Sequence, residues 1–216
     1  CPHPAIVYCV KFHQRERADL AKLMLELGPE APTSIEGWSV QDLAVHLYLR
    51  EHRPDAALGM FLTPFARHTE RTARRVSADL GFEGVVEAWA AGPPKLLKPV
   101  DAWMNTAENF IHHEDVRRAQ HGWQPRALPE DAQQALLTPL KTIGAMLLSP
   151  STAPVIAYPL GLPRVVLHDQ RGVARAGDDV VRIRGNVGEI LLHLFGRQSQ
   201  GLDLEGNVHG LRLRKL

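Results

Sequence analysis

The sequence predicts an α+β protein, in which an N-terminal four-helix bundle precedes a small α+β domain. Two observations support this fold class. Apolar residues recur at helical spacing as far as residue 148, and beyond Pro150 the chain changes to short segments rich in β-branched residues and bounded by Gly, Pro and Asp. We therefore place the helical domain at residues 11–150 and the α+β domain at residues 151–216.

The helices of the first domain are predicted from their apolar spacing and from the residues at their ends. The first runs from Lys11 to Leu27 and stops at Gly28-Pro29. The second begins after Ser39, an N-cap residue that forms a capping box with Asp42. Further helices are predicted at residues 63–80, 82–91, 101–118 and 129–148.

The second domain is predicted to contain four short strands and one helix. The helix covers residues 187–195, where Ile190, Leu191, Leu194 and Phe195 form its apolar side and leave Glu189 and His193 outside it. The strands lie in residues 154–160, 164–168, 179–185 and 202–206.

Composition excludes several classes of protein. The chain has 216 residues, 44% of them hydrophobic and 23% charged, which is ordinary for a globular protein able to bury a core. A formal net charge of +1 gives no electrostatic reason to bind nucleic acid or an anionic membrane. No apolar run approaches the roughly 18 residues that span a bilayer. We expect a cytoplasmic protein.

The N-terminal segment stands apart from this fold. We expect residues 1–10 to be a non-native leader or to precede the true start. The only cysteines, Cys1 and Cys9, are too few for a disulfide framework. A zinc knuckle made by them with His3 and His13 is rejected, because no second pair of ligands frames a small folded unit.

Three residues are the candidate metal ligands. Glu108 and His112 are four residues apart in a predicted helix and so project from the same face. His46, far upstream in the second helix, is the third. Two imidazole nitrogens and one carboxylate oxygen, with room for water, make the ligand set of a catalytic zinc site.

The spacing of this pair is not by itself diagnostic, because the chain contains three Glu-x-x-x-His pairs. Glu205 and His209 straddle a predicted turn, and Glu189 and His193 lie off the apolar face of their helix. Only Glu108 and His112 share a helical stripe that is part apolar and part polar, which suits a pocket inside a bundle.

Several nearby residues have two possible roles. Asp42 could orient His46, but we favour its role in the helix cap, while Asp115 could orient His112 or only stabilise the bundle. His68 is a further candidate ligand. His113 and Glu114 are predicted to face solvent. The arginine row, which we define as Arg67, Arg71, Arg74 and Arg75, forms either a solvated face or a rim that attracts an anionic substrate.

Motifs of other enzyme classes are absent from the sequence. It has no Gly-rich phosphate loop, no nucleophile elbow and no CxxC pair. Neither cysteine lies beside a base in a core segment, so a catalytic thiol, if one is involved, must come from a small molecule.

These residues resemble the DinB-like (YfiT-like) metal-binding bundle superfamily, and within it the mycothiol-dependent maleylpyruvate isomerase family. The resemblance rests on GWSVQDLAVHL and ENFIHHEDV. It extends to EILLHLFGRQ and LDLEGN in the second domain, and QRERADLAKLMLELGPEAPT, RPDAALG, RHTER and HHEDVRRAQHGW are similar to an uncharacterised metal-binding subgroup. The family's motif residues correspond to Trp38, Asp42, His46, Glu108, His112 and Asp115.

The resemblance implies a divalent metal, usually zinc, held by His46, Glu108 and His112. It also implies that Arg197 of the second domain assists catalysis, and that a low-molecular-weight thiol, mycothiol, attacks a small electrophilic substrate. We therefore expect a zinc-dependent mycothiol S-transferase or isomerase, present as a monomer or homodimer. Two alternatives stay open: a hydrolase that uses metal-bound water, and a protein that binds metal or ligand without turnover.

Overall fold

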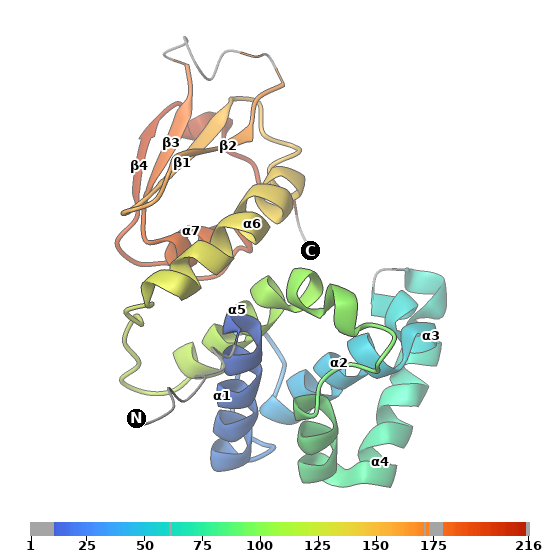
Figure 1. Cartoon of the computed structure of the whole chain (residues 1–216). Coiled ribbons are helices and arrows are strands. Elements are labelled where there is room, and N and C mark those ends of the chain that lie inside the picture. Colours follow the sequence, from blue (N-terminus) through green and yellow to red (C-terminus); the bar gives the residue numbers. More distant parts are fainter. Residues whose placement is uncertain (1–10, 61, 171, 173–178, 215–216) are drawn as a thin grey trace, which may run out of the picture. The chain divides into compact units, whose positions relative to one another are not determined.

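The computed structural model describes residues 11–60, 62–170, 172 and 179–214, and shows an α+β protein with a four-stranded sheet (Figure 1). Its contacts divide the chain into two compact units, Cys1–Gln124 and Pro125–Leu216. The predicted leader, residues 1–10, lies outside the described residues, and so do Cys1, His3 and Cys9. None of the described helices is both long and apolar enough to cross a membrane.

The first unit is helical. Its longer helices are α1 (Phe12–Leu27), α2 (Val40–His52), α4 (Ala66–Ala90) and α5 (Asp101–Arg118). Short elements connect α2 to α4 and α4 to α5, namely α3 (Pro54–Ala57) and the 3₁₀ turns η1 (Leu58–Met60), η2 (Thr63–Phe65) and η3 (Lys98–Val100).

The predicted end of α1 and the predicted start of α2 are confirmed. Gly28 ends α1 with a positive φ of 83°, and its N–H donates to the Met24 carbonyl. At the start of α2, the Asp42 N–H donates to the Ser39 hydroxyl and the Ser39 N–H donates to the Asp42 carboxylate. Asp42 therefore caps the helix and is not a partner of His46.

The core of the first unit lies where α1 packs on α5 and α2 packs on α4. Its fully buried side chains include Leu20, Leu43, Leu47 and Trp89. A buried ion pair also crosses this region, in which the Arg17 guanidinium donates to both oxygens of Glu51 at 2.9 Å. Arg17 also donates to the Trp89 carbonyl, so this pair joins α1, α2 and α4.

Helix α4 is kinked at Gly81, between the two helices that the sequence predicted at residues 63–80 and 82–91. Gly81 has φ 66° and ψ 177°, a conformation that side-chain-bearing residues rarely adopt. The sequence therefore identified the break, and the structure joins the two segments into one bent element.

The second unit consists of a sheet and two helices. The strands β1 (Val155–Pro159), β2 (Val165–His168), β3 (Val181–Gly185) and β4 (Asp203–Gly206) lie in the order β2-β1-β3-β4. The central pair, β1 and β3, is parallel, and each edge strand is antiparallel to its neighbour. Helix α7 (Val187–Leu194) packs against α6 (Glu130–Leu147) and the central strands.

The division between the units falls earlier than the boundary that we predicted at residue 150. Helix α6, which the prediction gave to the first domain, packs against α7 and β2 and belongs to the second unit. The change from helical to strand periodicity marks a change of element type, and it carries no information about which neighbours a helix packs against.

Candidate metal centre

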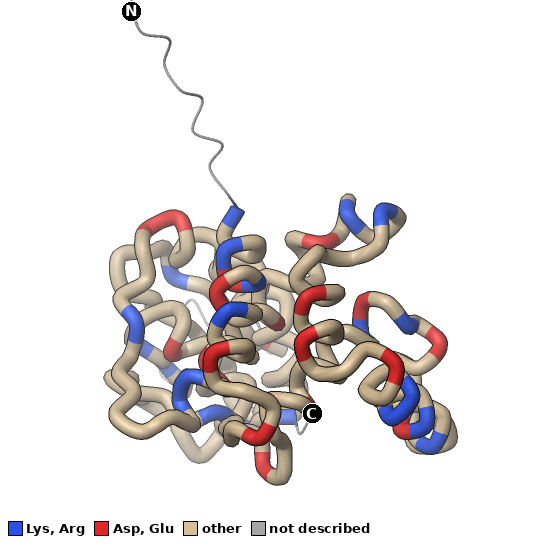
Figure 2. The backbone as a smooth tube through the Cα atoms, turned by 90° about the horizontal axis from the view of Figure 1, so that it is seen from below, with Lys and Arg blue, Asp and Glu red and all other residues tan. Residues whose placement is uncertain are grey.

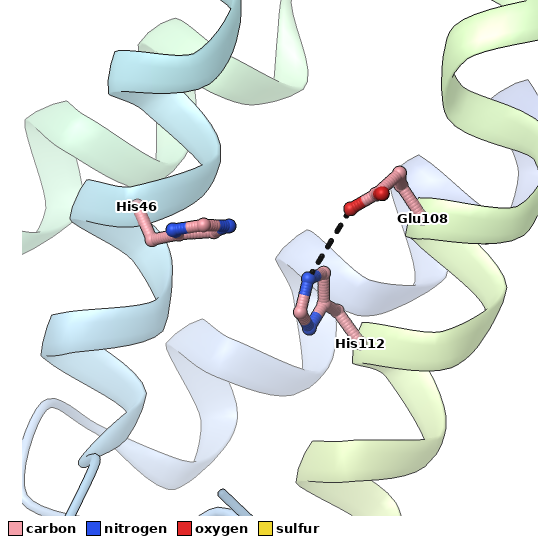
Figure 3. Close-up of side chains that lie close together, drawn as sticks. All are labelled: His46, Glu108 and His112. Carbon is pink, nitrogen blue, oxygen red and sulfur yellow. Dashed lines mark ion pairs between the residues drawn. The ribbon is translucent and has the colours of Figure 1, made fainter. Parts of the chain in front are cut away.

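Three side chains from two helices of the first unit converge on one point (Figure 3). His46 comes from α2, and Glu108 and His112 come from successive turns of α5. Each offers one ligand atom, and these atoms all lie within 4.8 Å of one another. The structure therefore brings together the three residues that the sequence selected as metal ligands.

His112 is oriented by a buried carboxylate one turn further along α5. The His112 Nδ1 lies 3.0 Å from Oδ2 of Asp115, whose side chain is fully shielded from solvent. This contact directs the other ring nitrogen, Nε2, toward Glu108, whose Oε2 lies 3.4 Å away. The Asp115 carbonyl in turn accepts from the Ser34 N–H, which ties α5 to the loop before α2.

His46 lies between two aromatic rings. Its ring centroid is 5.1 Å from that of Trp38 and 5.5 Å from that of His112, both in edge-on arrangements. Burial, with the added effect of the nearby His112, lowers the pKa of His46 to about 3. The ring is therefore neutral near pH 7, which is the form that binds metals.

Glu108 is ionised although it is partly shielded from water. Burial by itself would raise the pKa of Glu108, but the hydrogen bond from His112 and the charge of Arg50 outweigh it and lower this pKa to about 2. Burial likewise would lower the pKa of His112, but hydrogen bonds to Asp115 and Glu108 raise it. A cation bound between these groups would displace the proton that His112 shares with Glu108.

Arg50 is a component of the site that our sequence reasoning missed. Its Nε lies 3.6 Å from Oε2 of Glu108, and its two terminal nitrogens donate to the Asn105 side chain and the Met104 carbonyl. These contacts fix the guanidinium against α5. A signal was present in the sequence, because Arg50 follows His46 by four residues and so lies on the same face of α2.

The donor set fits a divalent cation. It offers one neutral imidazole, one carboxylate, and a second imidazole whose far nitrogen is held by a buried carboxylate, the arrangement common among metal-binding histidines. No further His, Cys, Asp or Glu among the described residues joins this group. Three protein ligands leave room for an exchangeable ligand, as in catalytic sites.

The other candidate residues lie elsewhere. His68 pairs with Asp55 at 3.0 Å on the surface and is not part of the cluster. The arginine row is exposed on α4. In the second unit, Arg197 follows α7 and donates to the Phe195 carbonyl at 3.0 Å.

Two predictions of exposure were wrong. His113 and Glu114 are both buried, with exposed fractions of 6% and 1%. His113 Nδ1 lies 3.0 Å from the Glu16 carboxylate of α1, and Glu114 accepts from Arg117 and Arg118. Because α5 is covered on several sides, its polar residues are buried with charged partners.

Glu189 in α7 was also predicted to lie outside the buried face, and it is 6% exposed. Its carboxylate accepts from the Gln200 N–H, which lies in the segment after the helix. The returning chain covers this side of α7, so the polar face of a helix is not always its exposed face.

Fold and site together describe an α+β protein with a three-residue candidate metal centre on two helices. No family model and no curated protein matches the chain. Its fold resembles that of two solved structures, the mycothiol-dependent maleylpyruvate isomerase and an alanine mutant of it. The TM-scores are 0.52 and 0.53, with 19% and 18% identity, and each match covers 96% of this chain and 100% of the other. This likeness supports the fold class.

Proposed function

We propose that this protein is a zinc-dependent thiol S-transferase or isomerase that uses mycothiol on a small electrophilic organic substrate. The observation that carries the proposal is the convergence of His46, Glu108 and His112 within 4.8 Å. The solved structures of similar fold are those of a mycothiol-dependent isomerase, which supports the choice of thiol. We further propose that α1, α2, α4 and α5 form a bundle of the DinB-like kind.

In this proposal, His46, Glu108 and His112 hold the zinc ion. A zinc ion bound by such residues lowers the pKa of a coordinating thiol, which makes it a nucleophile near neutral pH. Asp115 keeps Nε2 of His112 directed at the site, and Arg50 keeps Glu108 ionised and in place. Arg197 is proposed to assist the reaction by binding a carboxylate of the substrate, on the strength of the family resemblance.

The test is metal analysis of the purified protein, followed by anaerobic titration of mycothiol into a cobalt-substituted sample. We expect one metal ion per chain and a thiolate-to-cobalt charge-transfer band that saturates with mycothiol. His46→Ala and His112→Ala should each lose the metal. His68→Ala and His193→Ala are matched controls that should retain it.

The outcomes separate the remaining functions. Metal binding without a response to mycothiol or other thiols would reject the thiol chemistry and leave hydrolysis or non-catalytic binding. Loss of metal from the two control variants would show that the assigned ligands are wrong. A chain that binds no metal would reject the proposal.

A further inference from the structure

A cavity of about 870 Å³ lies within the first unit, between α2 and α4 and beside η1. Most of its wall is apolar, and the larger apolar side chains are those of Trp38, Val45, Leu49 and Met60. This volume is within the range of sites that enclose a whole small molecule, and an apolar wall with a few polar groups is typical of them.

The cavity adjoins the candidate metal centre. His46, whose ring is one of the three convergent ligands, also lines the cavity, together with Trp38, which packs edge-on against that ring. Glu108 and His112 do not line it. An occupant of the cavity would therefore lie next to His46, on the α2 side of the metal centre.

One positively charged group of the cavity wall is available to a ligand. Arg74 of α4 lines the cavity, is exposed, and has no hydrogen bond or ion pair with the described residues. Other polar residues of the wall already have partners. Gln41 of α2 donates to Ser77 of α4 at 3.3 Å, and Asp42 accepts hydrogen bonds in the cap of α2.

The charge of the wall also limits what can bind. A guanidinium matches the planar geometry of a carboxylate. Glu70, one turn before Arg74 on the same helix, is the remaining acidic residue of the wall and would repel a second carboxylate. Figure 2 shows Lys and Arg interspersed with Asp and Glu along the chain, so selection would depend on local groups and not on a field of one sign.

We propose that the cavity binds a monocarboxylic acid with an apolar body, whose carboxylate pairs with Arg74 and whose body lies against Trp38 and Met60. The further step of treating this cavity as the binding site for the electrophilic substrate rests on the proposed function. The proposal makes Arg74 a specificity-determining residue. One member of the arginine row would then bind the carboxylate of a ligand.

Isothermal titration of the full chain, both metal-free and zinc-loaded, tests this assignment. The probes are 2-naphthoate and 2-naphthylmethanol, which share the apolar body and differ in the carboxylate. We expect saturable binding of 2-naphthoate in the millimolar range or below. Arg74→Gln should weaken it about tenfold, as expected for loss of a hydrogen-bonded charge pair, and should leave 2-naphthylmethanol unaffected.

Matched variants separate the cavity from the general surface. Arg75→Gln removes a neighbouring exposed arginine that does not line the cavity, and it should change neither affinity. Ala73→Leu, which fills the cavity, should abolish binding of both probes. Ala78→Leu, at an exposed position of the wall where folding is not at risk, should weaken both.

Three results would overturn the assignment: no saturable binding of 2-naphthoate to the unmodified chain, equal losses in Arg74→Gln and Arg75→Gln, or unchanged binding in both filled variants. These results are independent of the thiol chemistry. If the metal-free chain bound naphthoate but mycothiol gave no response, the cavity assignment would hold and the thiol chemistry would be rejected. If mycothiol gave a response but naphthoate did not bind, only the cavity assignment would be rejected.

Discussion

Asp115 determines which nitrogen of His112 can serve as a ligand. The contact of 3.0 Å between Asp115 and Nδ1 places the proton there and leaves Nε2 facing Glu108 and His46. Because the Asp115 carboxylate is buried, a water molecule cannot take over its hydrogen bond to His112 when Asp115 is substituted. Asp115 is not itself a candidate ligand, and it therefore sets the orientation of one that is.

We predict that Asp115→Asn lowers zinc affinity by about 10- to 100-fold, the usual cost of losing such a partner of a metal-binding histidine. Competition with a chromophoric chelator measures the affinity. Asp55→Asn is the control, because Asp55 makes the equivalent contact to the exposed His68 away from the cluster. Similar losses in the two variants would contradict the assigned role of Asp115.

For single residues, the sequence predicted contacts correctly where both residues lie on one helix. The relation of Glu108, His112 and Asp115 follows from spacing along α5, and their contacts are as that spacing implies. The burial of His113 could not be predicted in this way, because it depends on Glu16 of another helix. Helical periodicity orders the residues around a helix and does not tell which neighbour covers each side.

Among the helices, the kink of α4 is the feature that a single substitution tests most directly. Apart from the adjoining backbone, an added Cβ at Gly81 would meet no atom within 4 Å, so a side chain there is opposed by the backbone conformation alone. We predict that Gly81→Ala lowers the free energy of unfolding by about 1–3 kcal/mol, the range for a side chain held in this region of φ and ψ.

Urea unfolding followed by circular dichroism measures this change. Glu83→Ala, an exposed substitution just beyond the kink in the same helix, is the control and should change stability little. An unfolding free energy that is unchanged or raised in Gly81→Ala would show that α4 can straighten without cost.

The helix ends and strands were predictable because their signals are local. Gly28, the Ser39–Asp42 capping box and Gly81 each act on residues a few positions away. The place of α6 was not predictable, because an apolar stripe packs equally well against helices or a sheet. Its contacts with α7 and β2 depend on segments that come later in the chain.

For the whole molecule, the buried His13 and the half-buried His193 make stability depend on pH. Burial lowers the pKa of both His13 and His193 below the ordinary value of 6.5. Above that value both the folded and the unfolded chain hold these rings neutral. As the pH falls below it, the unfolded chain gains protons before the folded chain does, so the folded state loses stability.

We predict that the free energy of unfolding of the metal-free chain falls between about pH 8 and about pH 5, and that His193→Gln reduces this fall. His193 is the more useful of the two, since His13 also contacts Asp101, which opposes the effect of burial. Urea unfolding at a series of pH values provides the measurement. An identical pH dependence in His193→Gln would contradict the prediction.

Among the described residues, the cavity and the candidate metal centre have one helix in common, α2. The convergent ligands lie on α2 and α5, whereas the wall opposite α2 is built by α4 and by η1, which carry none of them. At Gly59 in η1, an added Cβ would collide with the Phe65 carbonyl, so this turn packs closely on the start of α4. Substitutions in α4 would therefore alter which molecules fit the cavity and leave the three candidate ligands in place. Under the proposed function, the molecules that the cavity accepts could change while the residues that would hold the metal stay the same.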